Sequence, residues 1–327
     1  MPEIFQSQAW FDTLAACGFG RSPQVEWLGA GGLQLPVVVQ PDKSLAGLSN
    51  YYSALFGTLQ ADAVRCEAAP ASYGALAVAL RRHPGGGVLR FQPLDEQGEF
   101  LREMRSALAR AGYWTDTFFC FGNWYLPVGE GGYDAYFNAR PSALRHSMIR
   151  GRKRLSAQGE WGIRIHQHAQ DDLDAAIAAF TAVYARSWKV PEPRSDFVPR
   201  LIRVAAAQGW LRLGVLRLKG EPVAAQLWLV GGGKANIFKL AYVQGFERYS
   251  AGSVLTSALM QHVMEQDQVL EVDYLSGDDP YKQDWMSNRR VRVGLVAFDP
   301  RSIRGLRAGL LHFGRRYFKR LAGMGHA

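Results

Sequence analysis

A polar loop near residue 280 of this chain carries several groups that can exchange protons. Asp278, Tyr281 and Lys282 lie within five consecutive residues. A carboxylate can take a proton from an attacking nucleophile, and a phenol or an ammonium group can return one to a leaving group. Asp278 is therefore the first candidate for a general base, and Tyr281 is a candidate acid. The same aspartate equally suits a turn cap within residues 276–280, which is a common role for this residue type.

A turn upstream of that loop predicts a phosphate site, because it opens directly onto a predicted helix at 253–266. The first N–H groups of a helix have no intrahelical partner and the helix dipole is positive there, so this position favours an anion. The candidate donor-binding residues are the turn and its flanks, namely Tyr242, Arg248, Ser250, Ala251, Gly252, Ser253 and Lys282.

Two charged residues lie on the predicted strands that flank this helix. Lys239 lies in the middle of the strand at 235–242, and Asp273 lies in the strand at 269–275. A buried aspartate needs a compensating partner, and the strand pattern predicts that Asp273 lies beside Lys239. Both residues join the catalytic candidates. A structural ion pair and a solvated sheet face are the alternatives.

Composition indicates a globular chain and gives no sign of a metal or disulfide framework. The chain has 327 residues, of which 48% are hydrophobic, so it can bury a large core and two domains are expected. Its cysteines, Cys17, Cys66 and Cys120, are widely separated and form no CxxC pair. His166 and His168 are close in sequence but no third ligand is evident, so we predict no metal.

The net charge of +9 is concentrated in two segments. Residues 140–164 carry a net charge of +6 and residues 301–327 carry +7, so the remainder is acidic. Such local patches meet phosphates, nucleic acid or an anionic bilayer.

The order of the predicted elements indicates an α+β fold with twisted sheets flanked by helices. The first half mixes helices and aromatic-rich strands, and a glycine-rich break at 129–132 ends it. The elements predicted in the second half are helices at 171–187 and 195–208, a hairpin at 211–230, the strand, turn, helix and strand described above, and a closing strand at 291–297.

Several ordered motifs carry a resemblance to a known family. They are Phe238-Lys239-Leu240-Ala241-Tyr242, Arg248-Tyr249-Ser250-Ala251-Gly252, Asp273-Tyr274-Leu275-Ser276-Gly277-Asp278, and Tyr281-Lys282 with Trp285. This series resembles the GNAT-type acyltransferases of the Fem-like and CelD-like branch, whose members are often found among polysaccharide-biosynthesis proteins. The basic segment at 140–155 and the Ser187-Trp188-Lys189 stretch support it. The resemblance is strong from Tyr133 to Phe298 and loose over the first 130 residues.

The resemblance implies tandem GNAT-like lobes, each with a twisted mixed sheet flanked by helices. We expect an N-terminal lobe at 1–130, a C-terminal acyltransferase lobe at 131–300 and a basic amphipathic helix at 301–327. It also implies an acyltransferase that moves an acyl group from a thioester, with acyl-CoA as co-substrate and no metal, to an amine or hydroxyl of a small-molecule or saccharide acceptor. Glu247 and Ser250 depart from the common GNAT phosphate motif, which leaves the donor open.

Two other functions remain compatible with the same residues. An aminoacyl-tRNA-dependent Fem-like transferase would use the basic segment at 140–154 to hold RNA, although nucleic acid is not the expected partner. A noncatalytic nucleotide-binding scaffold would keep the phosphate turn, and substitutions at Asp278 would have no effect on it.

The C-terminal segment predicts contact with a membrane surface. Apolar residues recur at spacings of three and four from Ile303 to Tyr317, and the other face is rich in arginine and lysine. A basic amphipathic helix of this kind can lie on an anionic bilayer, or its apolar stripe can pack on the core. The amino terminus lacks a basic region followed by an apolar one, so we expect a cytoplasmic protein with peripheral contact at the inner membrane face through 301–321.

Overall fold

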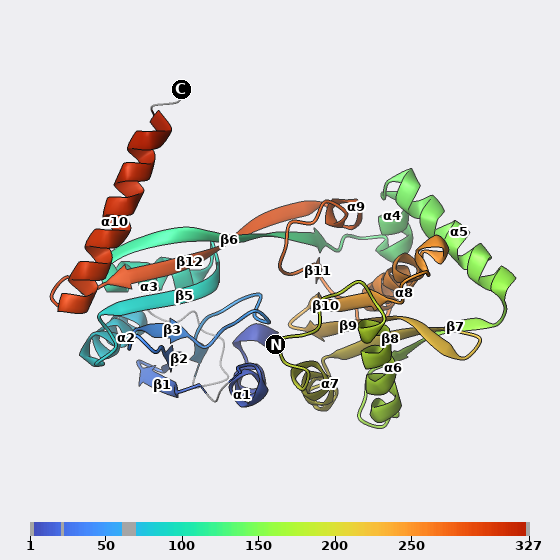
Figure 1. Ribbon diagram of the computed structural model, residues 1–327, viewed down its shortest axis with the longest axis horizontal. Helices are drawn as coiled ribbons and strands as arrows, with labels where there is room; N and C mark the ends of the chain where they lie inside the picture. The colour runs from blue at the N-terminus through green and yellow to red at the C-terminus, as the bar shows by residue number, and fades with distance from the viewer. Residues whose placement is uncertain (1–2, 21–22, 61–69, 325–327) are drawn as a thin grey trace. The chain divides into compact units, whose positions relative to one another are not determined.

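Helices and strands alternate along the chain in the computed structural model, which describes residues 3–20, 23–60 and 70–324 (Figure 1). The chain forms two units. One comprises Phe5–Phe121 and the segment from Val291 onward, and the other comprises Gly122–Arg290 with the described residues before Phe5. We call them the N-terminal unit and the GNAT-like unit. The sequence placed the boundary at residue 130 and treated the C-terminal helix separately, whereas packing groups that helix with the N-terminal unit.

The N-terminal unit has the strand order β1-β2-β3-β5-β12, with β4 paired to β2. Strands β3 and β5 are parallel, and the helix α2 lies between them in sequence. Its elements are η1 (Ile4–Gln6), α1 (Gln8–Cys17), β1 (Val25–Ala30), β2 (Leu33–Val39), β3 (Leu45–Gly47), β4 (Leu59–Gln60), α2 (Pro70–Arg82), β5 (Val88–Asp95), α3 (Glu99–Arg110), β6 (Trp114–Pro127), β12 (Asn288–Phe298) and α10 (Ile303–Met324).

The GNAT-like unit has the strand order β6-β11-β10-β9-β8-β7. Both β6 and β12 pass from one unit into the other along the chain. The remaining elements are α4 (Gly132–Asn138), α5 (Ser142–Gln158), β7 (Trp161–His166), α6 (Leu173–Ala185), α7 (Phe197–Ala207), β8 (Leu211–Leu218), β9 (Glu221–Gly231), β10 (Lys234–Tyr242), η2 (Glu247–Tyr249), α8 (Ala251–Glu265), β11 (Glu271–Asp273) and α9 (Lys282–Trp285).

The same sequence of pairings occurs in both units. In each, an antiparallel run of strands leads through one helix, α2 or α8, to a single parallel neighbour. An antiparallel strand then closes that side, β12 beside β5 and β6 beside β11. The α+β class with mixed sheets flanked by helices, predicted from the sequence, is confirmed.

The core of the GNAT-like unit lies where α8 packs on its central strands. Strand β9 is buried almost continuously from Val223 to Leu229, as expected for a central strand covered on both faces. A side chain at Gly214 of β8 would lie 3.0 Å from Leu255 and from Leu259 of α8. The absence of a Cβ atom there lets the helix approach the sheet closely.

Strand β11 is shorter than the predicted strand at 269–275. The Asp273 carboxylate accepts a hydrogen bond of 2.7 Å from the Leu275 N–H, and Leu275 adopts a φ of 55°. A side chain that caps the backbone two residues on, together with left-handed backbone, ends a strand. The loop that holds the predicted catalytic residues therefore begins two residues earlier than the sequence indicated, because β11 ends at Asp273 and not at residue 275.

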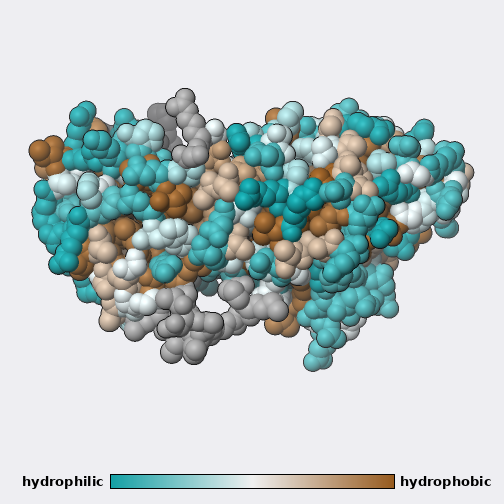
Figure 2. Space-filling model, turned by 90° about the horizontal axis from the view of Figure 1, so that it is seen from below, coloured by the Kyte–Doolittle hydropathy of each residue, from teal (hydrophilic) through white to brown (hydrophobic). Residues whose placement is uncertain are grey.

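The face drawn in Figure 2 shows hydrophobic residues in separate areas between hydrophilic ones. Among the described residues, every helix is too short or too polar to pass through a bilayer. Cys17 is buried and Cys120 is half-buried, while Cys66 lies outside the described ranges.

Candidate functional site

The central feature of the GNAT-like unit is a fork between β10 and β11. The two strands pair in parallel only over Lys234–Asn236 and Glu271–Asp273. A bulge between Ile237 and Lys239 follows, after which β10 continues to Tyr242 paired with β9 alone. We call the diverging segments 237–242 and 274–279 the fork. Within the described chain, the β10 edge of the fork has backbone groups outside any ladder, and these can bind a ligand.

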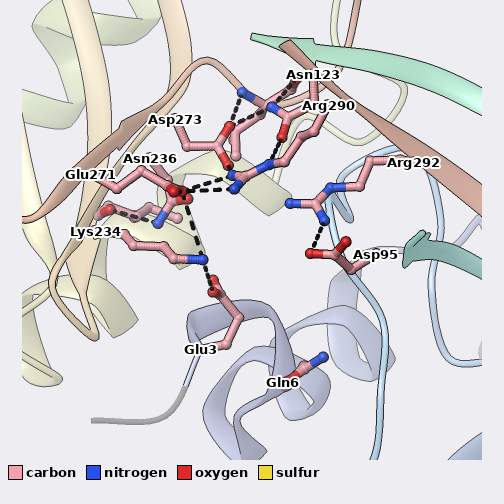
Figure 3. A network of polar contacts seen from close by, with 12 residues as sticks. Glu3, Gln6, Asp95, Asn123, Lys234, Asn236, Glu271, Asp273, Arg290 and Arg292 are labelled. Carbon is pink, nitrogen blue, oxygen red and sulfur yellow. Dashed lines mark hydrogen bonds and ion pairs between the residues drawn. The ribbon is translucent and has the colours of Figure 1, made fainter. Parts of the chain in front are cut away.

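Arg290 holds the paired end of the fork (Figure 3). Its guanidinium donates to both Glu271 oxygens, at 2.7 and 3.1 Å, to Asp273, and to Asn123 Oδ1 at 2.6 Å. It also lies 4.2 Å from the ring centroid of Tyr125. Burial opposes charge on Arg290, but the two carboxylates outweigh it and raise its pKa. The planar, five-donor guanidinium suits such a convergent arrangement.

The predicted pairing of Asp273 with Lys239 is wrong. Asp273 is 4% exposed and its carboxylate is taken up by Arg290, by Asn123 Nδ2 at 2.6 Å and by the backbone of the loop. The sequence suggested a lysine because it lay on the neighbouring strand, whereas the partner comes from β12. Both carboxylate oxygens of Asp273 accept hydrogen bonds from the protein, and this geometry is that of a structural residue.

Lys282 ties the loop after β11 together. Its ammonium donates to the carbonyl oxygens of Ser276 at 2.6 Å, Gly277 at 3.2 Å and Tyr274 at 3.4 Å, and pairs with Asp279 at 3.3 Å. An ammonium has three protons, so these contacts occupy all of them. Burial lowers the pKa of Lys282. The geometry supports loop shaping, and the predicted contact of Lys282 with a donor phosphate stays a prediction.

Asp278 lies in this loop on the molecular surface. Arg289 binds it at 2.9 and 2.5 Å, and the Trp124 indole donates to it at 3.0 Å. The hydrogen bonds from Arg289 lower the pKa of Asp278, which makes it less basic. Tyr281 is 43% exposed, and burial of the rest of its side chain together with Asp279 raises the pKa of Tyr281 to about 12. The roles of base and acid for these two residues stay predictions.

Lys239 lies at the bulge and meets a residue that the sequence did not single out. Its Nζ pairs with Glu192 Oε1 at 2.6 Å, and the Tyr184 hydroxyl donates to the same oxygen at 2.5 Å. Lys189 is close enough to feel the charge of Lys239. Burial, and then this charge, lower the pKa of Lys189. We call Tyr184, Lys189, Glu192 and Lys239 the lysine cluster.

The predicted phosphate turn precedes α8 as expected. Ser250 has a φ of 50°, and its side chain makes no cap to the helix. The N–H groups of Ala251, Gly252 and Ser253 have no described hydrogen-bond partner, while the next one, of Val254, bonds to Ser250 O. A side chain at Gly252 would come within 3.0 Å of the Tyr242 ring. Three free donors at a helix start form an anion cradle.

Other predicted donor residues surround this turn. Tyr242 is half-buried and its ring lies 4.3 Å from that of Trp188. Arg248 is exposed, with its guanidinium 4.8 Å from the Tyr249 ring and its carbonyl accepting from Arg154 of α5 at 2.6 Å. The close approach of α5 depends on a glycine, since a Cβ at position 151 would lie 2.6 Å from Tyr249 O. Basic residues of α5 therefore border the cradle.

The fork, the lysine cluster and the cradle lie on neighbouring parts of one unit. Free backbone N–H groups and ammonium groups can stabilise an oxygen that gains negative charge, and the cradle can hold a phosphate. Four further residues contact these parts of the unit, namely Glu192, Lys189, Arg289 and Arg290. The sequence pointed to none of their contacts, because they reach the fork from the α6–α7 loop and from β12, outside the segments that form it. In the described ranges, His, Cys, Asp and Glu form no group of three that could hold a metal ion.

Comparisons with known proteins agree with this arrangement. Residues 142–283 match the family model described as acetyltransferase (GNAT) domain. FemX has a similar structure, with a TM-score of 0.61 and 10% identity over 91% of this chain and 92% of that one. No curated protein sequence matches the chain.

Two further solved structures are similar. The C-terminal domain of an Agrobacterium fabrum protein described as a lysylphosphatidylglycerol synthetase has a TM-score of 0.55, with 13% identity and 84% of each chain covered. L-PGS from Bacillus licheniformis has a TM-score of 0.53, with 12% identity over 91% of this chain and 94% of that one. At these identities the likeness shows the fold. With the domain match, it supports the GNAT superfamily.

Replacing Arg290 tests whether it secures the paired end of the fork. Arg290→Met leaves the buried Asp273 without its cation and Glu271 with only Lys234, at 3.7 Å, so we expect the free energy of unfolding to fall by about 3 kcal/mol. Arg289→Met is the matched control, because its pair with Asp278 is exposed to solvent and should contribute little to stability. Urea denaturation of both variants measures the difference. Equal effects would contradict the structural role of Arg290.

Proposed function

We propose that this protein is an acyltransferase of the Fem-like and CelD-like type, which moves an acyl group from acyl-CoA to an amine or hydroxyl at the fork. The observation that carries the proposal is the parting of β10 from β11 beside three free N–H groups of α8. A thioester carbonyl beside the free edge of β10 meets backbone donors that also bind the oxyanion formed on attack. The cradle then takes the donor diphosphate.

The polar residues of the fork divide into two tasks in this proposal. Lys239 and the backbone of β10 act on the reacting carbonyl, and Lys239 is the ammonium that can protonate the leaving thiolate. Tyr242, Arg248, Ser250 and the start of α8 hold the donor. The acceptor enters from the opposite side, and a saccharide or lipid-linked precursor is compatible with that opening.

A second donor is favoured by one observation on α5. Arg150, Arg152, Lys153 and Arg154 of this helix are all exposed, and Arg154 contacts the carbonyl of Arg248 in the turn. This is more positive charge than one coenzyme needs, and a line of cations suits an RNA backbone. Aminoacyl-tRNA as the donor is therefore the alternative. Exchange of acetyl-CoA for charged tRNA in the same assay separates the two, and RNA-dependent transfer should weaken steeply with salt.

The activity is tested by incubating the protein with acetyl-CoA and candidate acceptors while following the release of free thiol. We expect acceptor-dependent thiol release and an acetylated product by mass spectrometry. A protein that binds coenzyme A in calorimetry but never consumes the thioester would be a scaffold. Failure to bind either coenzyme A or charged tRNA would overturn both donor proposals.

Substitution at Ser253 tests the cradle by removing one N–H group. Proline is tolerated in the first turn of a helix, so Ser253→Pro should keep the fold. Loss of one hydrogen bond to a charged group should weaken coenzyme A binding by roughly 2 kcal/mol, or more than tenfold in Kd. Ser253→Ala keeps the N–H group and is the control, with little change expected in calorimetry. Equal Kd values for both variants would remove the donor from this turn.

Asp278→Asn tests the base that the sequence suggested. A residue that takes a proton in every turnover contributes about 100-fold or more to the rate. Because Arg289 holds the Asp278 carboxylate and lowers its pKa, we expect kcat to stay within about tenfold of wild type and the donor Kd to be unchanged. Steady-state kinetics with acetyl-CoA measures both. A collapse of kcat at constant donor affinity would instead establish Asp278 as the base.

We propose further that α10 contacts an anionic membrane surface. The helix docks on its own unit through glycines, since a Cβ at Gly309 would lie 2.8 Å from the Trp114 ring, and through Phe313. The sequence left two alternatives, packing on the core and contact with a membrane. The helix docks through Gly309 and Phe313, whereas its described leucines remain exposed. The exposed apolar residues are Ile303, Leu306, Leu310, Leu311 and Tyr317. The side chains of 318–321 lie outside the description.

The surroundings of these residues suit an anionic bilayer. Leu310 and Tyr317 border an open groove of about 640 Å³ lined mainly by apolar side chains. Arg304, Arg307 and Arg315 are exposed beside it. Apolar side chains flanked by arginines are the pattern of helices that lie in a headgroup layer.

Vesicle sedimentation tests the α10 surface. We expect binding to vesicles that contain phosphatidylglycerol and weaker binding to pure phosphatidylcholine. Leu310→Glu should reduce it strongly, and Arg307→Gln should reduce it about fivefold, as expected for roughly 1 kcal/mol per arginine. Arg203→Gln, on α7 in the other unit, is the control for loss of one exposed arginine. Binding that ignores both lipid charge and Leu310→Glu would contradict the proposal.

A further inference from the structure

Glu192 combines deep burial with an oxygen that has no hydrogen-bond partner. Its side chain is 9% exposed. Oε1 accepts from Lys239 and from Tyr184, whereas Oε2 is buried and without a partner among the described residues. An ionised oxygen left unsatisfied in the interior is costly, and native proteins keep few of them. Such an oxygen beside a candidate reaction centre is suited to accept a hydrogen bond from a substrate.

The location of Glu192 is the second part of the argument. It lies in the loop between α6 and α7, and its ion pair with Lys239 holds it at the bulge of β10, where the fork opens. Lys189 and Asp279 are its charged neighbours. The negative charges of Asp279 and Glu192 both favour the charged form of the Lys189 ammonium. The carboxylate is therefore fixed next to the edge where the thioester carbonyl is proposed to lie.

We propose that Glu192 Oε2 binds the nucleophile of the acceptor and takes up its proton. The inference rests on the acyl transfer proposed above. An amine attacks through its lone pair and loses its proton only after the nitrogen has become cationic and strongly acidic. A carboxylate can accept that proton, and as a general base it can also take a proton from a hydroxyl group during its attack. Burial, and after it the charge of Lys239, lower the pKa of Lys189 although Asp279 and Glu192 oppose the shift, and burial favours the uncharged form of an incoming amine in the same way.

The Glu192–Lys239 pair can return the proton to the leaving group. The amine nitrogen forms a bond to the carbonyl carbon, and the carbonyl electron pair moves to oxygen. Glu192 Oε2 takes the proton from nitrogen, the electron pair on oxygen re-forms the carbonyl as the carbon–sulfur bond breaks, and Lys239 protonates the thiolate. Glu192 contacts Lys239 through Oε1, at 2.6 Å, so the proton taken up at Oε2 reaches Lys239 once the carboxyl group turns, and this restores both charges. Thioester and amine are converted to amide and thiol with no other reactant.

Glu192→Gln tests this role. The amide oxygen still accepts hydrogen bonds from Lys239 and Tyr184, whereas the uncharged NH₂ group takes the position of Oε2 and cannot take up a proton. With acetyl-CoA and a panel of D-glucosamine, L-lysine and ethanolamine, we expect kcat/KM for the accepted amine to fall by about 100-fold or more. The acidic limb of its pH profile should disappear, while the Kd of coenzyme A stays within twofold. Glu221→Gln, at an exposed position of β9 in the same unit, is the control and should leave all three unchanged.

Added carboxylate separates proton transfer from structural support. We expect Glu192→Ala to regain part of its activity with millimolar formate, which restores a carboxylate beside Lys239. Wild-type kcat/KM and pH profile in Glu192→Gln would overturn the inference while the proposed acyltransferase stands. If acetyl-CoA is never consumed with any acceptor, the proposed function fails and the role of Glu192 fails with it.

Discussion

The short parallel pairing of β10 with β11 is the constraint on which the site depends. Three residue pairs join the strands, and beyond Asn236 and Asp273 they diverge. Two parallel strands would normally continue to pair, because unpaired backbone groups in a sheet interior lose hydrogen bonds. Here the bulge in β10 and the left-handed Leu275 after β11 direct the two chains apart. The backbone N–H groups on the unpaired edge of β10 are then where the proposed thioester carbonyl would bind, in place of a carbonyl of a neighbouring strand.

Such a fork is stable only if its closed end is firmly held, and the polar network around Arg290 does this. Glu271 and Asp273 both come from β11, and two carboxylates so close would repel without a shared cation. Arg290 serves both and also reaches Asn123 of β6. The network therefore connects three strands at the point where pairing stops. Strain in the loop after β11 is opposed by Lys282, which binds three of its carbonyl groups.

Local features of the fold were predictable from sequence, and long-range partners were not. The hairpin of β8 and β9, the helix α8 and the turn before it follow from turn residues and apolar periodicity within short windows. The partner of Asp273 depends on the register of β12, which approaches from another part of the sequence. The length of β11 depended on a side-chain cap that a continuous apolar pattern conceals. Hydrophobic spacing cannot report either.

The α6–α7 loop shows the same limit at the candidate site. Glu192 lies between Pro191 and Pro193 in a segment without apolar periodicity, so no sequence signal singled it out. Prolines restrict their own backbone and that of the preceding residue, which makes the loop stiff enough to hold a charge against β10. The sequence singled out Lys239 for its place in the strand, but its partner could only be found in three dimensions.

Two carboxylate and cation groups in this unit differ in a way that separates structure from chemistry. Around Arg290 every carboxylate oxygen of Asp273 and Glu271 has a donor, and the cation is a guanidinium that keeps its proton. Around Lys239 one oxygen of Glu192 lacks a donor, and the cation is an ammonium that can release a proton. Complete hydrogen bonding resists any change in protonation, whereas an incomplete set leaves a place for a substrate proton. Removing the first group should therefore lower stability, and altering the second should lower turnover while the fold persists.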